Sequence, residues 1–299
     1  MASLRRSRRD GAIDLVFLAP TLALLVGLLA YPVASGIALS LHSARGFELT
    51  DYVGLDNYAR AILGDAVFHR SLVNTVVFTA AAVTLQIGIG LVLATLVAGV
   101  RRGGTLLLLA FSTPFVLATV AVGAVWKFLY APYFGLAPTI GSALGLDLST
   151  VAPLADTETA LWAILAAFVW RFAGFTMVVY LAGIQGLSRD YYDYAVVEGG
   201  GWWQGLRHIT WPLLWPQTFA LVMLGTIGAL RVFDMMWIMT AGGPSHATET
   251  VATYVYSTAF RFLDVGYAQA MAMLLLLVIL LLTAIEYRIM SRRAEVVSS

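Results

Sequence analysis

Residues 71–100, SLVNTVVFTAAAVTLQIGIGLVLATLVAGV, contain no aspartate, glutamate, lysine or arginine. A helix crosses the roughly 30 Å hydrocarbon core of a bilayer with about 20 apolar residues, because each residue adds about 1.5 Å. The apolar residues run continuously and do not alternate with polar ones, which excludes a strand of a membrane β-barrel. The stretch therefore predicts a membrane-spanning helix.

Five further stretches of the chain have the same character. Three contain no charged side chain, and two are interrupted only by Arg171 in one and by Arg231 and Asp234 in the other. Together they predict an all-α polytopic membrane protein with six transmembrane helices. The expected boundaries are 13–290 for the membrane domain, 1–12 and 291–299 for two tails, and about 13–41, 72–99, 105–130, 159–184, 212–240 and 268–288 for the helices.

The composition of the whole chain agrees with a membrane protein. Of the 299 residues, 60% are hydrophobic and 12% are charged, whereas about a quarter of the residues in a soluble domain are charged. This excludes a soluble enzyme, a coiled coil, a disordered hub and a nucleic-acid binder. The first apolar stretch is also longer than the 7–15 residues of a signal peptide. With no cysteine in the chain, a disulfide framework and a cysteine metal site are excluded as well.

The basic residues predict the orientation of the helices, because cytoplasmic loops carry an excess of arginine and lysine. A cytoplasmic N-terminus gives the larger set of basic residues to the inside, and this predicts that both termini are cytoplasmic. The inner set is Arg5, Arg6, Arg8, Arg9, Arg101, Arg102, Arg189, Arg207, Arg288, Arg292 and Arg293, and the outer set is Arg45, Arg60, Arg70, Lys127 and Arg261.

The inner loop over residues 185–211 has a pattern of its own. Residues 190–198 predict a short helix, the three glycines 199–201 break it, and a second short helical stretch follows. We expect Thr210 to cap the fifth membrane helix and Pro212 to lie in its first turn. The segment fits either a groove on another protein or the lipid headgroup layer. Its few basic residues favour a protein partner.

The same loop resembles the EAA loop of the membrane subunits of binding-protein-dependent ABC importers. That family's pattern is Glu-Ala-Ala, three residues, Gly, nine residues, Ile, then Leu-Pro. Gly199 and Ile209 keep the spacing, while Asp193 stands where Glu is usual, Tyr194 where Ala is usual and Trp211 where Leu is usual. Segments in order over residues 15–288 are similar to the carbohydrate branch of the family, among them 53–58, 126–130, 240–244 and 266–268.

The resemblance implies a type I importer permease fold in a prokaryotic plasma (inner) membrane. It implies that the chain forms half of an alternating-access pathway for a sugar or related polyol. The implied partners are a second permease subunit, two cytoplasmic ATPase subunits that hold ATP and Mg²⁺, and an extracytoplasmic solute-binding protein or lipoprotein. The residues implied to couple to the ATPases are Tyr192, Asp193, Tyr194, Ala195, Glu198, Gly199, Gly201, Arg207, Ile209 and Pro212.

Ionisable residues inside membrane helices are costly and therefore point to functional sites. Arg231 and Asp234 are spaced i and i+3 in the predicted fifth helix, which puts them on one helical face. They form either a self-neutralising internal pair or a polar patch on the solute pathway. Arg171 has no partner nearby in the sequence, which favours lining a cavity. The pathway candidates are Trp126, Trp170, Arg171, Arg231, Phe233, Asp234 and Trp237.

The outer segment Gly242, Gly243, Pro244 is a candidate contact for the binding protein, although a tight turn explains it equally well. The chain has no phosphate-binding Gly-x-x-x-x-Gly-Lys-Ser/Thr motif, and its four histidines lack metal-ligand spacing. We therefore expect no enzyme activity, cofactor or metal in this chain. The alternative is a stand-alone ion-coupled transporter or channel, which would leave the inner loop unexplained and has only Asp234 as an acid within a span.

Overall fold

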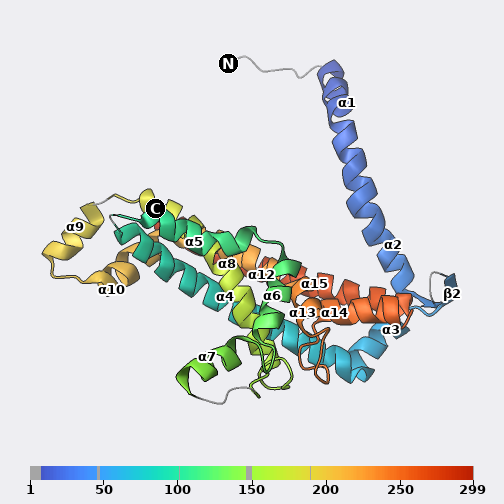
Figure 1. The fold of residues 1–299 in the computed structure, drawn as a ribbon. Helices are drawn as coiled ribbons and strands as arrows, with labels where there is room; N and C mark the ends of the chain where they lie inside the picture. The colour runs from blue at the N-terminus through green and yellow to red at the C-terminus, as the bar shows by residue number, and fades with distance from the viewer. Residues whose placement is uncertain (1–7, 46–47, 101, 146–149, 189, 299) are drawn as a thin grey trace. The chain divides into compact units, whose positions relative to one another are not determined.

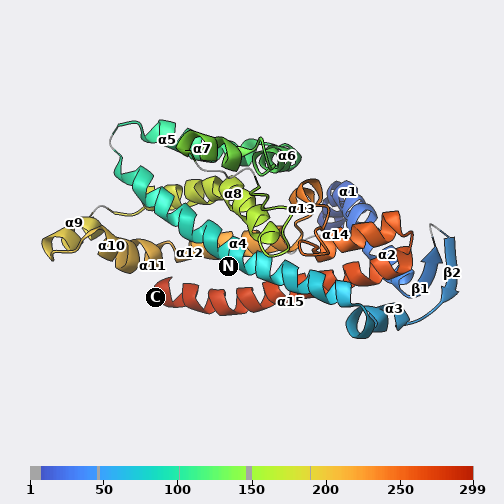
Figure 2. The same cartoon turned by 60° about the horizontal axis from the view of Figure 1, so that its bottom comes forward.

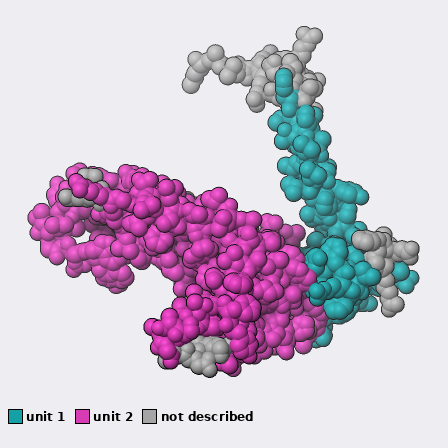
Figure 3. Space-filling view, viewed as in Figure 1, with its two compact units in different colours: residues 1–64, 255–274 teal, residues 65–254, 275–299 magenta. Residues whose placement is uncertain are grey.

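The computed structural model describes residues 8–45, 48–100, 102–145, 150–188 and 190–298. Four of the residues used for orientation, Arg5, Arg6, Arg101 and Arg189, lie outside the described residues, as does most of the predicted tail 1–12. The chain divides into two compact units, one of residues 1–64 and 255–274 and the other of residues 65–254 and 275–299 (Figure 3).

The first unit contains a long exposed helical run and a small hairpin. The run comprises α1 (Arg8–Leu25), the π-helical turn η1 (Val26–Ala30) and α2 (Tyr31–Ser40). Only 6% of its apolar part, Phe17–Ser40, is buried. Strands β1 (His42–Arg45) and β2 (Glu48–Tyr52) pair antiparallel. This hairpin is a departure from the all-α prediction.

Hydrogen bonds fix the outer end of α2 in the first unit. After the hairpin come α3 (Asp56–Ala59) and η2 (Arg60–Gly64), and later η4 (Ser257–Arg261) and the start of α15 (Val265–Ser298). The Ser40 and Tyr58 hydroxyls are 2.7 Å apart, and Asn57 Nδ2 donates to the Ser40 carbonyl at 2.9 Å. Asn57 and Tyr58 thus satisfy polar groups that the end of a helix leaves open.

The second unit is built on two long helices that pack side by side, α4 (Ala66–Gly99) and α8 (Ala160–Gln185) (Figures 1 and 2). Asp65 caps α4, and its carboxylate accepts from the Val67 and Phe68 amides at 2.8 and 2.9 Å. Gly90 allows the close crossing, because a Cβ there would lie 2.4 Å from Thr176 Cγ2. Both helices match predicted spans closely.

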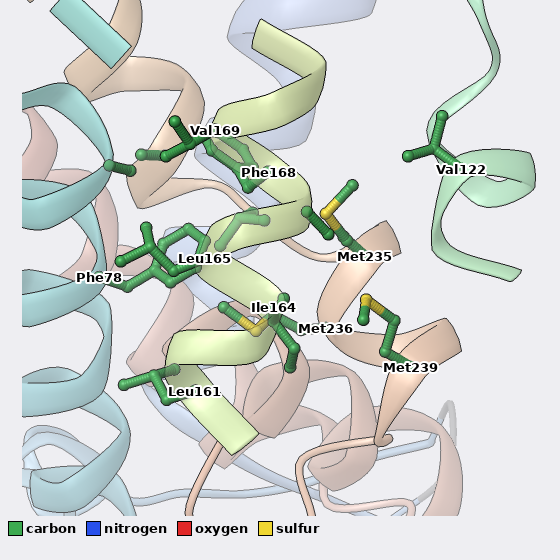
Figure 4. Close-up of a cluster of buried hydrophobic side chains, with 14 residues drawn as sticks. Phe78, Val122, Leu161, Ile164, Leu165, Phe168, Val169, Met235, Met236 and Met239 are labelled. Atoms are coloured by element: carbon green, nitrogen blue, oxygen red, sulfur yellow. The ribbon is translucent and has the colours of Figure 1, made fainter. Parts of the chain in front are cut away.

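The remaining elements of the second unit surround this helix pair. An apolar cluster joins α4, α8, α6 (Thr119–Leu129) and α13 (Asp234–Met239), and Figure 4 shows its side chains converging. The cluster includes Phe78, Val122, Ile164, Phe168, Met235 and Met236. The other elements are α5 (Gly104–Val116), α7 (Leu136–Leu144), α9 (Asp190–Val197), α10 (Trp202–Gly205), η3 (Leu206–Thr210), α11 (Trp211–Leu213), α12 (Trp215–Leu230) and α14 (Val251–Tyr256).

Two of the predicted helices are not continuous. The predicted helix 105–130 is the pair α5 and α6, bent by 100° where Leu117 and Ala118 adopt extended backbone angles. The predicted helix 212–240 is also divided. It bends by 74° near Leu214, just before Pro216, which has no amide hydrogen to continue the helix. It breaks again between α12 and α13. Among the described residues, four helices are long and apolar enough to cross a membrane, or up to six if each bent pair counts as one.

Candidate functional site

The inner loop forms a compact helical hairpin, which we call the coupling segment and define as residues 190–213. Its first helix, α9, ends at Val197. The Gly199 and Gly200 amides then donate to the Val196 and Ala195 carbonyls at 3.0 and 2.7 Å. Gly199 has φ +81°, a left-handed angle that glycine adopts freely. The predicted order of helix, glycine break and second helix is confirmed.

A hydroxyl pair ties the two arms of the coupling segment together. The Tyr192 hydroxyl and Thr210 Oγ1 are 3.0 Å apart, and Thr210 Oγ1 donates to the Gly205 carbonyl at 3.3 Å. Thr210 therefore does not cap the fifth membrane helix as we expected, because residues 202–213 already form a continuous helical run through η3. Gly205 is buried close to the Tyr192 ring. Sequence reasoning missed Gly205, since a lone glycine carries no signal of its tertiary neighbour.

The outer surface of the coupling segment presents apolar and aromatic side chains. Tyr194, Val197 and Trp203 are 73%, 85% and 62% exposed. A cavity of about 470 Å³ lies between the two arms. Four of the predicted coupling residues, Tyr194, Ala195, Glu198 and Ile209, line the cavity together with Tyr191, Gly200, Gln204 and His208. Asp193, Arg207 and Pro212 are exposed elsewhere on the segment, and Gly201 begins its second arm by donating its amide to Gln204 Oε1.

Arg171 lies inside the helix bundle and contacts the break between α5 and α6. Its side chain is in the middle of α8 and only 9% exposed. Nη2 donates to the Leu117 carbonyl at 2.9 Å and to the Phe115 carbonyl at 3.3 Å. The guanidinium carbon also lies 4.6 Å from the centre of the Phe172 ring. Arg171 thus binds backbone that the broken helix leaves unpaired.

Arg231 and Asp234 do not share a helical face, so this prediction is wrong. Arg231 ends α12 and Asp234 begins α13, and the two intervening residues are not helical. The i and i+3 argument assumed a continuous helix. In the structure, the charge of Asp234 acts on the Arg171 guanidinium from another part of the chain.

The aromatic pathway candidates come together in two pairs. The Trp126 and Trp170 rings meet edge to face, with centres 5.6 Å apart, and the Phe233 and Trp237 rings stack with centres 5.7 Å apart. Trp170 also lines an apolar cavity of about 750 Å³ between α4, α5 and α8. The first pair joins α6 to α8 near the charged residues, which sequence order did not reveal.

The segment around Gly242 is a tightly folded loop. A Cβ on Gly242 would lie 2.3 Å from Glu249 Oε2, and its φ is +87°. The Glu249 side chain is buried and pairs with His246 Nδ1 at 3.0 Å. Asn74 Nδ2 donates to the Glu249 carbonyl at 2.9 Å and joins the loop to α4. Gly242 itself is buried, while Gly243 and Pro244 are half-buried.

A buried carboxylate in α15 was missed because it lies just beyond the charge-free stretch that ends at residue 285. Glu286 Oε1 accepts from the Thr226 hydroxyl of α12 at 2.7 Å. Among the described residues, no group of three or more His, Asp or Glu side chains could hold a metal ion.

Residues 86–296 match the family described as the binding-protein-dependent transport system inner membrane component. The lactose transport system permease protein LacF of Rhizobium radiobacter is 30% identical over 298 residues, which cover 96% of this chain and 98% of that protein. The sulfoquinovosyl glycerol transport system permease protein SmoG of Agrobacterium fabrum is 31% identical over 288 residues, covering 94% and 91%. The fold is similar to a chain of a bacterial alginate ABC transporter solved with an alginate pentasaccharide-bound periplasmic protein, with TM-score 0.82, 22% identity and 96% coverage of both chains.

Proposed function

Because the chain belongs to the family of binding-protein-dependent transport system inner membrane components, we propose that it forms half of the translocation pathway for a sugar or related polyol. It is a permease subunit of an ABC importer and not an enzyme, since ATP is hydrolysed by the partner ATPases of such importers. Family membership favours this function over the stand-alone ion-coupled transporter or channel.

The solute class rests on similarity along nearly the whole chain. LacF and SmoG are named for lactose and for sulfoquinovosyl glycerol, and each covers more than nine-tenths of this chain. Both solutes carry several hydroxyl groups, which bind polar side chains and stack against aromatic rings. The pathway candidates Trp126, Trp170, Arg171, Arg231, Phe233, Asp234 and Trp237 include both kinds of side chain.

The chain is a multi-pass inner-membrane protein, and we propose that it crosses the membrane six times with both termini in the cytoplasm. This counts the four long helices together with the two bent pairs. An even number of spans puts both termini on one side, and the coupling segment follows the fourth span on that same side. The basic residues of the sequence favour the cytoplasm for this side.

The coupling segment is proposed to dock on the cytoplasmic ATPases. Its exposed aromatic residues and the cavity beside Glu198 suit a protein partner. ATP and Mg²⁺ would act there, on the ATPases. Closure of the ATPase pair would move the segment, and the motion would pass through α11 into α12, which follows directly in the chain. The pathway would then open outward to take the solute from an extracytoplasmic binding protein, with a second permease subunit forming its other half.

The loop at Gly242, Gly243 and Pro244 is proposed to contact the binding protein or lipoprotein. The buried Glu249 and the hydrogen bonds of Asn74 hold this loop in one conformation. Gly242 supports the loop from inside, so Pro244 is the better placed of the three for direct contact. A rigid loop loses little conformational entropy when a partner binds.

The coupling role is tested with Gly199→Asp and Glu198→Arg in the importer expressed with its own ATPases. Both variants are expected to insert but to lose ATPase co-purification and solute uptake. A Cβ on Gly199 has no atom within 4 Å, so the loss would come from the partner and not from a clash within the chain.

Gly103→Asp is the matched control for this experiment. Gly103 also has positive φ, at +86°, and open space around its Cβ, but it lies in another inner loop. Glu198→Gln keeps the side-chain size without reversing the charge. Normal ATP-driven uptake by both Gly199→Asp and Glu198→Arg would refute the coupling assignment.

A further inference from the structure

The two broken spans of the second unit leave backbone groups without helical partners. The α5 helix ends at Val116, and the extended residues Leu117 and Ala118 separate it from α6. The last carbonyls of a helix have no amide of their own helix to accept from. In a membrane there is no water to replace it, so another part of the protein must supply the donor.

Arg171 supplies this donor from a straight, well-packed helix. The α8 helix runs unbroken from Ala160 to Gln185 and packs along α4. From its middle, Arg171 reaches the Phe115 and Leu117 carbonyls at 3.3 and 2.9 Å. A cation at the C-terminus of a helix also interacts favourably with the helix dipole. The break is therefore held against α8 by a charge-assisted contact.

A second cation connects the other broken span to α6. Lys127 Nζ, near the end of α6, donates to the Ile238 carbonyl in the last turn of α13 at 3.1 Å. Gly123 lets the two helices approach, since a Cβ there would lie 3.4 Å from Ile238 Cγ2. At the other end of α13, Asp234 occupies the first turn, and its charge acts on Arg171. The contacts therefore link α8, α6 and α13.

The surroundings of Arg171 argue against direct contact with a solute. Nη2 is used by two backbone carbonyls, and the ring of Phe172 covers the guanidinium. Nε is buried and has no hydrogen-bond partner among the described residues. A solute hydroxyl outside the packed side chains would therefore not reach it.

We propose that Arg171 is a positioning residue of the translocation pathway, which holds the α5–α6 break to α8 through the Phe115 and Leu117 carbonyls and does not bind the solute. Its effect on transport rests on the proposed function, whereas its effect on the bend does not. When the spans tilt, α6 and α13 would move as one pair because both are linked through this residue.

The bend can be measured directly, because the chain contains no cysteine. Leu106 on α5 and Val125 on α6 are 72% and 56% exposed, so Leu106→Cys and Val125→Cys accept spin labels without disturbing the core. The distance distribution between the labels is measured in the purified importer in nanodiscs, without solute. We expect one narrow distribution with Arg171, a broadened or shifted one with Arg171→Met, and a narrow one again with Arg171→Lys.

Uptake by the same variants gives the second measurement. Charge-assisted hydrogen bonds of this kind shift a local equilibrium by about tenfold to a hundredfold. Arg171→Met is therefore expected to lower the maximal uptake rate by about tenfold or more, with less solute moved per ATP. The half-saturating concentration of solute-loaded binding protein should change less than about twofold. Arg171→Lys should restore most of the rate.

Arg171→Gln keeps hydrogen-bond donors without the charge, and it replaces Arg171→Met if that variant does not assemble. An unchanged distance distribution in the assembled Met or Gln variant would overturn the proposal, whatever the uptake rate. A raised half-saturating concentration with unchanged maximal rate and distances would instead assign Arg171 to solute binding. Because the distances are measured without solute, the claim about the bend stands or falls independently of which solute is imported.

Discussion

The hydroxyl pair of Tyr192 and Thr210 leads to a quantitative prediction about coupling. The pair joins residues 18 apart in sequence at 3.0 Å and is partly buried. Tyr192→Phe removes the hydroxyl but keeps the ring next to Gly205. Thr210 retains its bond to the Gly205 carbonyl, so no buried group is left unsatisfied. The expected cost is about 1 kcal/mol, the net value of one neutral hydrogen bond.

A loss of about 1 kcal/mol raises the population of the open coupling segment about fivefold. Hydrogen exchange of the α9 amides in the assembled importer should accelerate by this factor if local opening limits exchange. A looser segment transmits less motion, so the amount of solute imported per ATP hydrolysed should fall. Tyr191→Phe is the matched control, because Tyr191 is on the same helix and 51% exposed.

A double-mutant cycle with Tyr192→Phe and Thr210→Val isolates the pair. We expect a coupling energy of about 1 kcal/mol, since residues in direct contact are not additive. If Tyr192→Phe exchanges at the same rate as Tyr191→Phe, the hydroxyl pair does not hold the coupling segment together and the reasoning is refuted.

Two further predictions concern the other sites. Gly242→Ala should lower the melting temperature of the purified complex, because a left-handed alanine costs about 1–2 kcal/mol and its Cβ would displace the Glu249 carboxylate; an unchanged melting temperature would contradict the tight packing of this loop. Exchanging Arg231 and Asp234 should abolish uptake, since Arg171 would then face an arginine instead of its acidic neighbour. Full uptake by the exchanged variant would restore the idea of a self-contained pair.

The absence of charges located the apolar segments well. Residues 71–100 were predicted as a span and lie almost entirely in α4, and residues 190–198 were predicted as a short helix and form α9. Both predictions depend on local chemistry. Apolar side chains favour the bilayer, and the three glycines after α9 interrupt a helix wherever they occur.

The helix breaks could not be predicted in the same way. An uncharged stretch such as 105–130 reveals that it is apolar but not whether its backbone is continuous. The break at Leu117 is stabilised by Arg171, which is 54 residues away in sequence. For the same reason the spacing of Arg231 and Asp234 misled, since it has meaning only within one helix.

Tertiary neighbours also changed the interpretation of candidate residues. Gly242 was predicted as a surface contact, yet it is buried against Glu249. Nothing next to Gly242 in sequence indicates this, because Glu249 arrives through a reversal of the chain. The chemistry of a loop can be read from its residues, but the face it presents depends on what folds beneath it.

The π-helical turn η3 has a consequence for how the coupling segment can change in evolution. A π turn accommodates one residue more than an α turn, and here Thr210 Oγ1 reaches the carbonyl of Gly205 five residues earlier. Deleting a single residue between Leu206 and Thr210 would rotate everything that follows by about 100°. Thr210 would turn away from Tyr192, and α12 would present a different face to α4. Substitutions leave this angular phase intact, whereas insertions and deletions do not, so the length of the segment is constrained more strictly than its composition.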